Sequence, residues 1–389
     1  MPNVYDTVRR SRIISDMYSR NLFVYGFLKY ICSKDSVSTL TGRSRVSNKL
    51  RKIAVALFVA GMLAGMFFSF KKEAKNNSTT QSVFAMDTYM DITAYGYNSE
   101  KAVTAAMDEI KRLDALLSTG SNTSEVTLLN RNKSGVISED YSYLLKRSID
   151  LWETTEGKFD ITIYPIMRAW GFVDKKYNVP SDDELASLLE NVNVSKIIYD
   201  ENENIVTLPQ GVEIDFGGIA KGYTSDRVAQ IMKEYGIESA ILNLGGNVHT
   251  IGAKSDGSLW KIAIKHPYDS ASYLGVISIK DKAVITSGGY ERYFEENGST
   301  YHHIIDPQTG KPAQNGLVSV TIVSADGALA DGLSTSLYVM GTDKAIDYWK
   351  SHNDEFDAVL CDDAGMVYVT EGLSGYFSSE SEYKIIKAS

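Results

Sequence analysis

The sequence predicts an α+β fold, with one large mixed domain over residues 82–389 that follows an N-terminal transmembrane helix. Segments with a helical period occur beside segments with strand-like alternation, without the strict alternation of a βαβ fold. An uncharged apolar run separates this domain from a basic N-terminal segment. The chain has 389 residues, 43% of them apolar, which is enough for a large buried core.

The N-terminal region is predicted to have three parts. Residues 1–52 carry 11 Lys or Arg and 3 Asp or Glu, a net charge of +8. Residues 53–70 contain no charge, and their 18 positions approach the length that crosses a bilayer as a helix. The basic side is expected to stay in the cytoplasm, which makes the chain a single-pass membrane protein with its large domain on the extracytoplasmic side. A cleaved signal peptide is the alternative, but no small-x-small cleavage site follows the run. Residues 71–81 are polar and typical of a linker.

The charge argues against a nucleic-acid substrate, and the cysteine content argues against a fold that depends on a disulfide. Residues 53–389 carry a net charge of −17, since the whole chain carries −9. Nucleic acid requires a basic surface, so it is not an expected substrate, whereas a small anion would bind with the help of a divalent cation. The two cysteines, Cys32 and Cys361, lie on opposite sides of the predicted membrane segment, so the fold does not depend on a disulfide.

The first half of the domain is predicted to be mostly helical. Residues 83–96 alternate like a strand or hairpin arm, and residues 100–119 carry apolar side chains at helical spacing. A second helix is expected over 138–157, with Ser138 as its cap. Two further helices are expected over 180–192 and 224–236.

The second half is predicted to be mostly strands, followed by two helices and a final strand pair. The expected strands cover 238–246, 259–267, 275–288, 302–307 and 317–324. The expected helices cover 330–339 and 342–352, and the final strands cover 357–362 and 365–372.

Two of four unusual clusters combine glycine with aromatic or acidic residues. FDITIYPIMRAWGF, residues 159–172, is consistent with a core loop or with a pocket in which Trp170 and Phe172 flank a flat ring. DFGGIAKGYTSDR, residues 215–227, places a carboxylate and a glycine pair before a helix, where an anion is favoured. It matches neither the Walker loop nor the Rossmann pattern, and a tight turn into a packed helix is the alternative.

The other two clusters carry histidines and hydroxyl groups. In YHHIIDPQTGKP, His302 and His303 would point to opposite faces of a strand, so at most one enters a given site as a general base. A plain loop between strands is the alternative. In ADGLSTSLYVMG, Asp331, Ser334 and Thr335 share one helix face, which suits a hard cation such as Mg²⁺ or simple helix capping.

Eight segments of the sequence, in order, resemble the ApbE family, the FAD:protein FMN transferases. They are MDTYMDI, LDALLSTG, FDITIYPIMRAWGF, DFGGIAKGYTSDR, LNLGGNV, HHIIDPQTGKP, NGLVSVTIVSA and ADGLSTSLYVMG, which together span most of residues 82–375. Each motif alone is modest, but eight in order are specific. The resemblance implies a domain of the ApbE, T-fold-like type.

The resemblance also implies an activity, cofactors and partners. The expected reaction is the Mg²⁺-dependent transfer of the FMN half of FAD to a Thr or Ser hydroxyl of a partner flavoprotein, with release of AMP. The expected partners are FMN-binding subunits of membrane redox complexes, of the sodium-translocating quinone reductase or Rnf type. Two alternatives remain open: a pyrophosphatase that converts FAD to FMN and AMP, and a non-catalytic, membrane-tethered flavin-binding protein.

Roles for individual residues follow from the same resemblance. His303 is similar to the family's proposed base. The expected Mg²⁺ ligands are Asp331, Ser334, Thr335 and the main-chain carbonyl of Gly218. The expected flavin-nucleotide contacts are Met86, Ala169, Trp170, Gly171, Asp215, Lys221 and Ile305.

Three positions depart from the family pattern. Gly120 stands where an aromatic residue is frequent, which puts one ring contact in doubt. Ser334 stands where some members carry Asp, so the cation site is expected to be weaker or completed by water. Lys221 stands where some members carry Glu, and it would pair with a phosphate.

Overall fold

The computed structural model describes residues 57, 60–61, 77–269 and 271–389. The chain divides into two compact units, residues 1–68 and 69–389, and the second is described below. The predicted basic segment, nearly all of the predicted anchor at 53–70 and the start of the predicted linker lie outside the described residues. Within the described residues, no helix is both long enough and apolar enough to cross a membrane.

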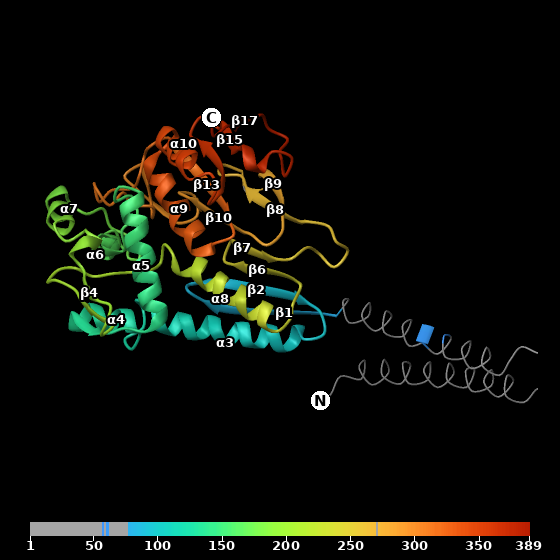
Figure 1. Cartoon of the computed structure of the whole chain (residues 1–389). Coiled ribbons are helices and arrows are strands. Elements are labelled where there is room, and N and C mark those ends of the chain that lie inside the picture. The colour runs from blue at the N-terminus through green and yellow to red at the C-terminus, as the bar shows by residue number, and fades with distance from the viewer. Residues whose placement is uncertain (1–56, 58–59, 62–76, 270) are drawn as a thin grey trace, which may run out of the picture. The chain divides into compact units, whose positions relative to one another are not determined.

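A nine-stranded sheet forms the centre of the second unit (Figure 1). Its order is β1-β2-β6-β7-β10-β13-β14-β15-β17, and every neighbouring pair is antiparallel except β15–β17. The strands are β1 (Ser78–Ala85), β2 (Thr88–Tyr95), β6 (Ser239–Leu244), β7 (Asn247–Ile251), β10 (Ala283–Gly288), β13 (Leu317–Ser324), β14 (Asp357–Asp362), β15 (Val367–Thr370) and β17 (Tyr383–Ile386).

Three long helices pack on this sheet. They are α3 (Ser99–Leu117) on β1 and β2, α8 (Ala220–Glu234) on β6 and β7, and α9 (Gly327–Met340) on β10 and β13. Alternate side chains of β2 are fully buried, as the strand period requires, and they share a core with α3 and α8. The next helix, α10 (Thr342–Ser351), packs against α9 and β14.

A small three-stranded sheet adds a second core. Its strands are β8 (Trp260–Lys265), β9 (Tyr273–Ile279) and β16 (Phe377–Ser378), in the order β16-β9-β8. Alternate residues of β8 are buried, and they pack with Val284, Val323 and Val359 of the central sheet. At β10, β13 and β14, the central sheet therefore lies between helices on one face and this second sheet on the other.

The chain between α3 and α8 forms a mainly helical subregion (Figure 1). Its helices are α4 (Glu125–Asn132), α5 (Glu139–Thr154), η1 (Ile161–Ile163), α6 (Tyr164–Ala169), α7 (Asp182–Leu189) and η2 (Val194–Lys196). Its sheet has the order β3-β5-β4, from β3 (Ser134–Val136), β4 (Ile198–Asp200) and β5 (Ile205–Thr207). A separate hairpin of β11 (Tyr293–Glu296) and β12 (Ser299–His302), and the turn η3 (Glu371–Leu373), complete the unit.

The predicted mixed α+β class is confirmed, but several boundaries differ. Ser138 caps α5 as predicted, since its hydroxyl accepts a hydrogen bond from the Tyr141 N–H. The sheet already begins at Ser78, inside the predicted linker. The predicted strand 275–288 is two strands in different sheets, because the chain turns at Asp281, where φ is +52°. The predicted strand at 302–307 is wrong beyond His302, where the chain makes a turn closed by an Ile305–Pro312 bridge.

Candidate active site

A cavity of about 900 Å³ is lined by segments that are far apart in the sequence. Its volume lies within the range of small-molecule and cofactor sites. The lining residues come from 86–88, 158–163, 215–221, 243–248, 286–293, 303–307 and 331–335, together with Met167, Lys175, Tyr177, Ala263 and Lys265. The topology therefore gathers residues from six of the eight motif segments around one space.

The loop before α8 and the first turn of that helix contribute Asp215, Gly218 and Lys221 to this cavity. The Asp215 carboxylate accepts a hydrogen bond from the Gly217 N–H at 2.9 Å. Burial raises the pKa of Asp215, while the charges of Arg292 and Lys221 act in the opposite direction. Gly218 lies close to the Phe159 ring, because a Cβ added at Gly218 would stand 3.0 Å from it. A side chain at this position would therefore press on the Phe159 ring.

Helix α9 contributes Asp331 and Thr335. The Asp331 carboxylate is 5% exposed and accepts hydrogen bonds from the Gly222 N–H at 2.8 Å and the Asn247 side-chain amide at 3.0 Å. Burial raises its pKa, and the nearby Lys221 charge opposes that shift. The Thr335 hydroxyl lies 3.3 Å from that of Ser287, which also lines the cavity.

The two adjacent histidines are separated as predicted, and only His303 lines the cavity. The His303 Nδ1 lies 3.1 Å from the Arg292 carbonyl oxygen, which can only accept, so Nδ1 carries the hydrogen. Burial and the Arg292 charge lower the pKa of His303 to about 3, so the ring is neutral at pH 7. Its Nε2 therefore has a free lone pair and can accept a proton.

His302 uses both ring nitrogens in the fold. Its Nε2 donates to the Ala313 carbonyl at 2.9 Å, and its Nδ1 accepts from the Ile304 N–H at 3.3 Å. Its ring packs edge-on against Tyr338. His302 is therefore a structural residue, and His303 is the histidine available for chemistry.

The charge in the cavity is balanced, although residues 53–389 as a whole are strongly acidic. Its lining includes the five cationic residues Lys158, Lys175, Lys221, Lys265 and Arg292, and the five acidic residues Asp87, Asp160, Asp215, Glu291 and Asp331. Three of the lysines pair with carboxylates at 3.2 to 3.6 Å. Among the described ion pairs none includes Lys221 or Arg292, which leaves both cations for an anionic ligand.

The turn between β1 and β2 brings Met86 to the cavity. Met86 and Asp87 have φ of 49° and 61°, as a two-residue hairpin turn requires. The Met86 N–H donates to the Asp114 carboxylate at 2.8 Å, and the Thr224 hydroxyl lies 3.7 Å from the Met86 sulfur. Helices α3 and α8 therefore hold this turn in place.

The predicted RAWGF contacts lie behind the cavity, because its lining includes none of Ala169, Trp170 and Gly171. Trp170 is 2% exposed, and its Nε1 donates to the Gly310 carbonyl at 2.8 Å. Gly171 has a φ of +75°, and a Cβ there would stand 2.0 Å from the Lys176 carbonyl oxygen. The loop packs against the predicted contact Ile305, which does line the cavity.

Ser334 also lies outside the lining of the cavity. It is fully buried, and its hydroxyl donates to the Asp331 carbonyl at 2.8 Å and lies 2.7 Å from the Ser287 hydroxyl. The structure therefore brings Asp331, Thr335 and Gly218 to the cavity and leaves Ser334 behind them.

Sequence reasoning missed Arg292, Lys158 and Asn247 as site residues. Arg292 precedes β11, and its guanidinium donates to the Phe172 carbonyl at 2.8 Å. No spacing pattern connects these residues, because separate strands and loops bring them together. Asn247 follows the glycine pair of LNLGGNV, which was the one signal that the sequence offered.

The oxygen donors at the start of α9 fit a hard cation. Asp331 offers a buried carboxylate and Thr335 a hydroxyl, and Gly218 lines the same cavity. The described residues contain no group of three or more His, Cys, Asp or Glu that would hold a metal alone. Mg²⁺ commonly takes one or two protein carboxylates and completes its shell with substrate phosphates and water, so this donor set suits it.

Comparison with known proteins identifies relatives of similar length. A model described as the ApbE family matches residues 86–360. The FAD:protein FMN transferase of Haemophilus influenzae is 32% identical over 299 residues, which cover 74% of this chain and 86% of that protein. The FAD:protein FMN transferase of Escherichia coli K12 is 28% identical over 306 residues, which cover 74% of this chain and 87% of that protein.

Solved structures show the same fold. The ApbE protein of Thermotoga maritima has a TM-score of 0.73 at 32% identity, over 78% of this chain and 100% of that chain. The flavin transferase ApbE of Vibrio cholerae has a TM-score of 0.70 at 27% identity, over 77% of this chain and 99% of that chain.

Proposed function

The chain belongs to the ApbE family, and on that basis we propose that it is an FAD:protein FMN transferase. The substrate would be FAD, the acceptor a Thr or Ser hydroxyl of a partner flavoprotein, and the second product AMP. One observation of the structure carries the proposal: a neutral histidine, a buried carboxylate, and two cations without a carboxylate partner among the described ion pairs all line one cavity of cofactor size. That combination suits displacement at a phosphorus atom.

The transfer step uses His303 as the base. The acceptor hydroxyl oxygen forms a bond to the FMN-side phosphorus, and the bond from that phosphorus to the bridging oxygen breaks. AMP leaves with the bridging oxygen, and the His303 Nε2 takes the hydroxyl proton and passes it to solvent. FAD and the acceptor hydroxyl thus give a phosphoester-linked FMN, AMP and one proton.

Cationic side chains would hold the diphosphate in line for this step. Lys221 and Arg292 both line the cavity and have no carboxylate partner among the described ion pairs. The Arg292 guanidinium is fixed by its bond to the Phe172 carbonyl, and its own carbonyl orients His303. Arg292 would therefore position both the anion and the base.

Bound Mg²⁺ would supply neutralisation of the diphosphate and of the charge that develops on AMP. Asp331, Thr335 and the main-chain carbonyl of Gly218 would hold it, since all three residues line the cavity. The hydrogen bonds from Gly222 and Asn247 orient the Asp331 carboxylate and help to keep it ionised. Ser334 would not contact the cation, but its hydroxyl would support the site through the Asp331 carbonyl and the Ser287 hydroxyl.

The sequence supports a proposal for the location of the enzyme, and the family resemblance supports one for the acceptor. We propose that the chain is anchored in the cell membrane by residues 53–70, with the enzyme domain on the extracytoplasmic side. FMN-binding subunits of membrane redox complexes, of the quinone reductase or Rnf type, would then be acceptors within reach of a tethered enzyme.

A transfer assay tests the proposal. The 389-residue chain, solubilised in detergent, is incubated with FAD, Mg²⁺ and an FMN-binding subunit of the quinone reductase type. We expect a fluorescent acceptor band on a denaturing gel and a mass increase equal to FMN. His303→Gln and Asp331→Ala should lose the band, whereas Asp347→Ala, on the exposed side of α10, should keep it.

The assay also separates the two alternatives. FMN and AMP in solution without a labelled acceptor would identify a pyrophosphatase. Tightly bound, intact FAD without either product would identify a flavin-binding protein without chemistry.

A further inference from the structure

Helices α8 and α9 approach each other through a pair of glycines. A Cβ added at Gly222 would stand 2.1 Å from the Gly327 carbonyl oxygen, and one added at Gly327 would stand 2.7 Å from the Gly222 carbonyl oxygen. The two backbones are therefore in direct contact at the start of α9. This contact lies one helical turn before Asp331, so a small rotation of α9 would move the Asp331 carboxylate.

The Asp226 side chain of α8 holds the first residues of α9. Its carboxylate oxygens accept hydrogen bonds from the Gly327 N–H at 2.8 Å and the Ala328 N–H at 2.9 Å. One turn earlier on α8, the Gly222 N–H donates to Asp331. Two contacts on successive turns therefore fix both the distance and the rotation of α9 relative to α8.

Ser225 of α8 and His249 of the sheet support this contact from the side. The Ser225 hydroxyl donates to the Gly222 carbonyl at 2.7 Å, so its oxygen accepts from the His249 Nδ1 at 3.0 Å. His249 belongs to β7, is 5% exposed, and is 3.7 Å from the Asp226 carboxylate. The strand, α8 and the start of α9 are thus joined by one set of polar contacts.

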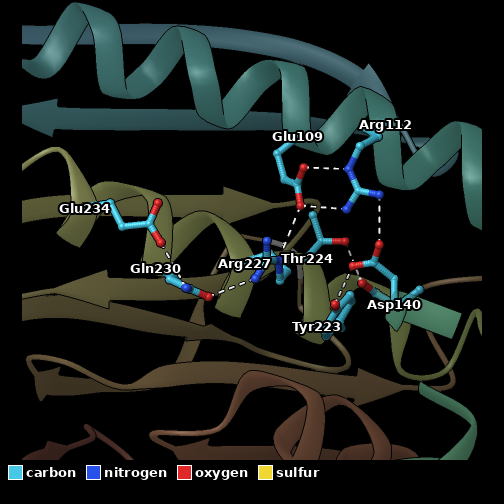
Figure 2. Close-up of polar contacts among 9 residues, drawn as sticks. Glu109, Arg112, Asp140, Tyr223, Thr224, Arg227, Gln230 and Glu234 are labelled. Atoms are coloured by element: carbon cyan, nitrogen blue, oxygen red, sulfur yellow. Dashed lines mark hydrogen bonds and ion pairs between the residues drawn. The ribbon is translucent and has the colours of Figure 1, made fainter. Parts of the chain in front are cut away.

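A second network, on the adjacent face of α8, anchors this helix to α3 and α5 (Figure 2). The Tyr223 hydroxyl donates to Asp140 of α5 at 2.6 Å, and Arg112 of α3 pairs with the same carboxylate at 2.8 Å. Arg227 of α8 lies 3.4 Å from Glu109 of α3. These contacts fix α8 to α3 and α5. Because Asp226 belongs to this fixed helix, its hydrogen bonds to Gly327 and Ala328 hold the start of α9 in a fixed position.

We infer that Asp226 is a positioning residue for the cation-binding side of α9, and that its loss weakens cation binding without removing a ligand. This inference rests on the proposed function, because it takes Asp331 and Thr335 as the cation ligands. Both follow Gly327 on α9, at four and eight residues, and so lie on its side that faces the cavity. Residues that orient a ligand from outside the coordination shell affect metal affinity about 10- to 100-fold when replaced.

Asp326 offers a matched control on the same helix terminus. Its carboxylate caps α9 through the Leu329 N–H at 2.8 Å and pairs with Arg147, but among the described residues it makes no hydrogen bond or ion pair with α8. Asn caps a helix about as well as Asp, so Asp326→Asn should leave the terminus intact. Asp226→Asn is the same chemical change at the other position. It replaces one of two acceptor oxygens with an NH₂ group that faces a backbone N–H, so one of the two hydrogen bonds to the start of α9 is lost.

The test measures binding of Mn²⁺ by the 389-residue chain with saturating FAD, using the electron paramagnetic resonance signal of free Mn²⁺. We expect Asp226→Asn to weaken the Mn²⁺ affinity about ten-fold or more, and Asp326→Asn to leave it within about two-fold of the original. Asp226→Glu keeps both acceptor oxygens on a longer side chain and should give an intermediate loss. FAD affinity without metal should be the same in all three variants.

The outcomes separate this inference from the proposed function. Equal Mn²⁺ affinity in Asp226→Asn and the original chain, or an equal loss in Asp226→Asn and Asp326→Asn, would overturn the positioning role alone. If the original chain binds no Mn²⁺ in the presence of FAD, both the cation site and the inference are wrong. If Asp226→Asn does not fold, Asp226→Glu decides, and unchanged affinity in that variant contradicts the inference.

Discussion

The glycine contact between α8 and α9 makes a prediction in which two local effects oppose each other. Gly222 lies in the first turn of α8, at a position where helix propensity alone favours Ala by about 1 kcal/mol. The Cβ of Ala would stand 2.1 Å from the Gly327 carbonyl oxygen and 2.7 Å from the Asp331 Cβ. Ordinary contact begins near 3.4 Å, so α9 must move by more than 1 Å to accept the methyl group.

The steric term should win. Overpacking of a tight contact costs about 1–3 kcal/mol, and here a backbone carbonyl blocks the methyl group, so the upper part of that range applies. After the gain in propensity, we expect Gly222→Ala to lower the free energy of unfolding by about 1–2 kcal/mol. For a domain of this size the loss corresponds to a Tm about 1.5–3 °C lower.

The FMN-transfer activity of Gly222→Ala should fall together with its stability, because the added methyl group would displace Asp331 along with the rest of α9. Thermal unfolding and the FMN-transfer assay are run on Gly222→Ala and on Gly120→Ala. A Cβ at Gly120 has its nearest neighbour at 3.6 Å, an ordinary contact, so this control should keep its Tm and its activity. A Gly222→Ala variant with an unchanged or higher Tm and full activity would refute the reasoning about this contact.

Two further predictions concern the cavity. Because burial and Arg292 lower the pKa of His303 to about 3, the base form persists as the pH falls, and kcat/KM for FAD should show no loss near pH 6.5 that is due to this histidine. A pH–rate profile with an acid limb near pH 6.5 that moves when His303 is replaced would contradict the lowered pKa. Arg292→Met should raise the Kd for FAD about ten-fold or more, measured by flavin fluorescence, because a charged contact to the diphosphate is lost together with the bond to the Phe172 carbonyl. Lys261→Met, exposed on β8 and outside the cavity lining, is the matched control and should bind FAD normally.

The sequence predicted which motifs meet but not how each side chain is used. Asp215, Lys221, His303, Asp331 and Thr335 all line one cavity, as the order of the motifs suggested. The prediction that at most one of the two adjacent histidines enters the site also holds, although His303 lies just beyond the end of β12 and not on a strand. These predictions depend on local pattern, which the sequence carries directly.

Features that depend on tertiary packing were not predictable. Trp170 was expected at the ligand but lies in the core, because its indole N–H finds a carbonyl 140 residues away. Ser334 shares a helical spacing with Asp331, yet the rotation of α9 turns its hydroxyl to the Asp331 carbonyl. The net charge also suggested a site short of cations, whereas the cavity lining balances five Lys or Arg residues against five Asp or Glu residues. The net charge of the chain and the spacing of residues along a helix do not determine which side of that helix faces the site.

The central claim is that FAD cleavage is coupled to covalent transfer. The most direct test is the ratio of AMP released to FMN bound covalently on the acceptor, measured in one reaction by chromatography and intact-protein mass. We expect a ratio of one, no products after chelation of Mg²⁺, and recovery of both products when Mg²⁺ is added back. AMP in large excess over bound FMN, or transfer that continues in the presence of chelator, would contradict the account.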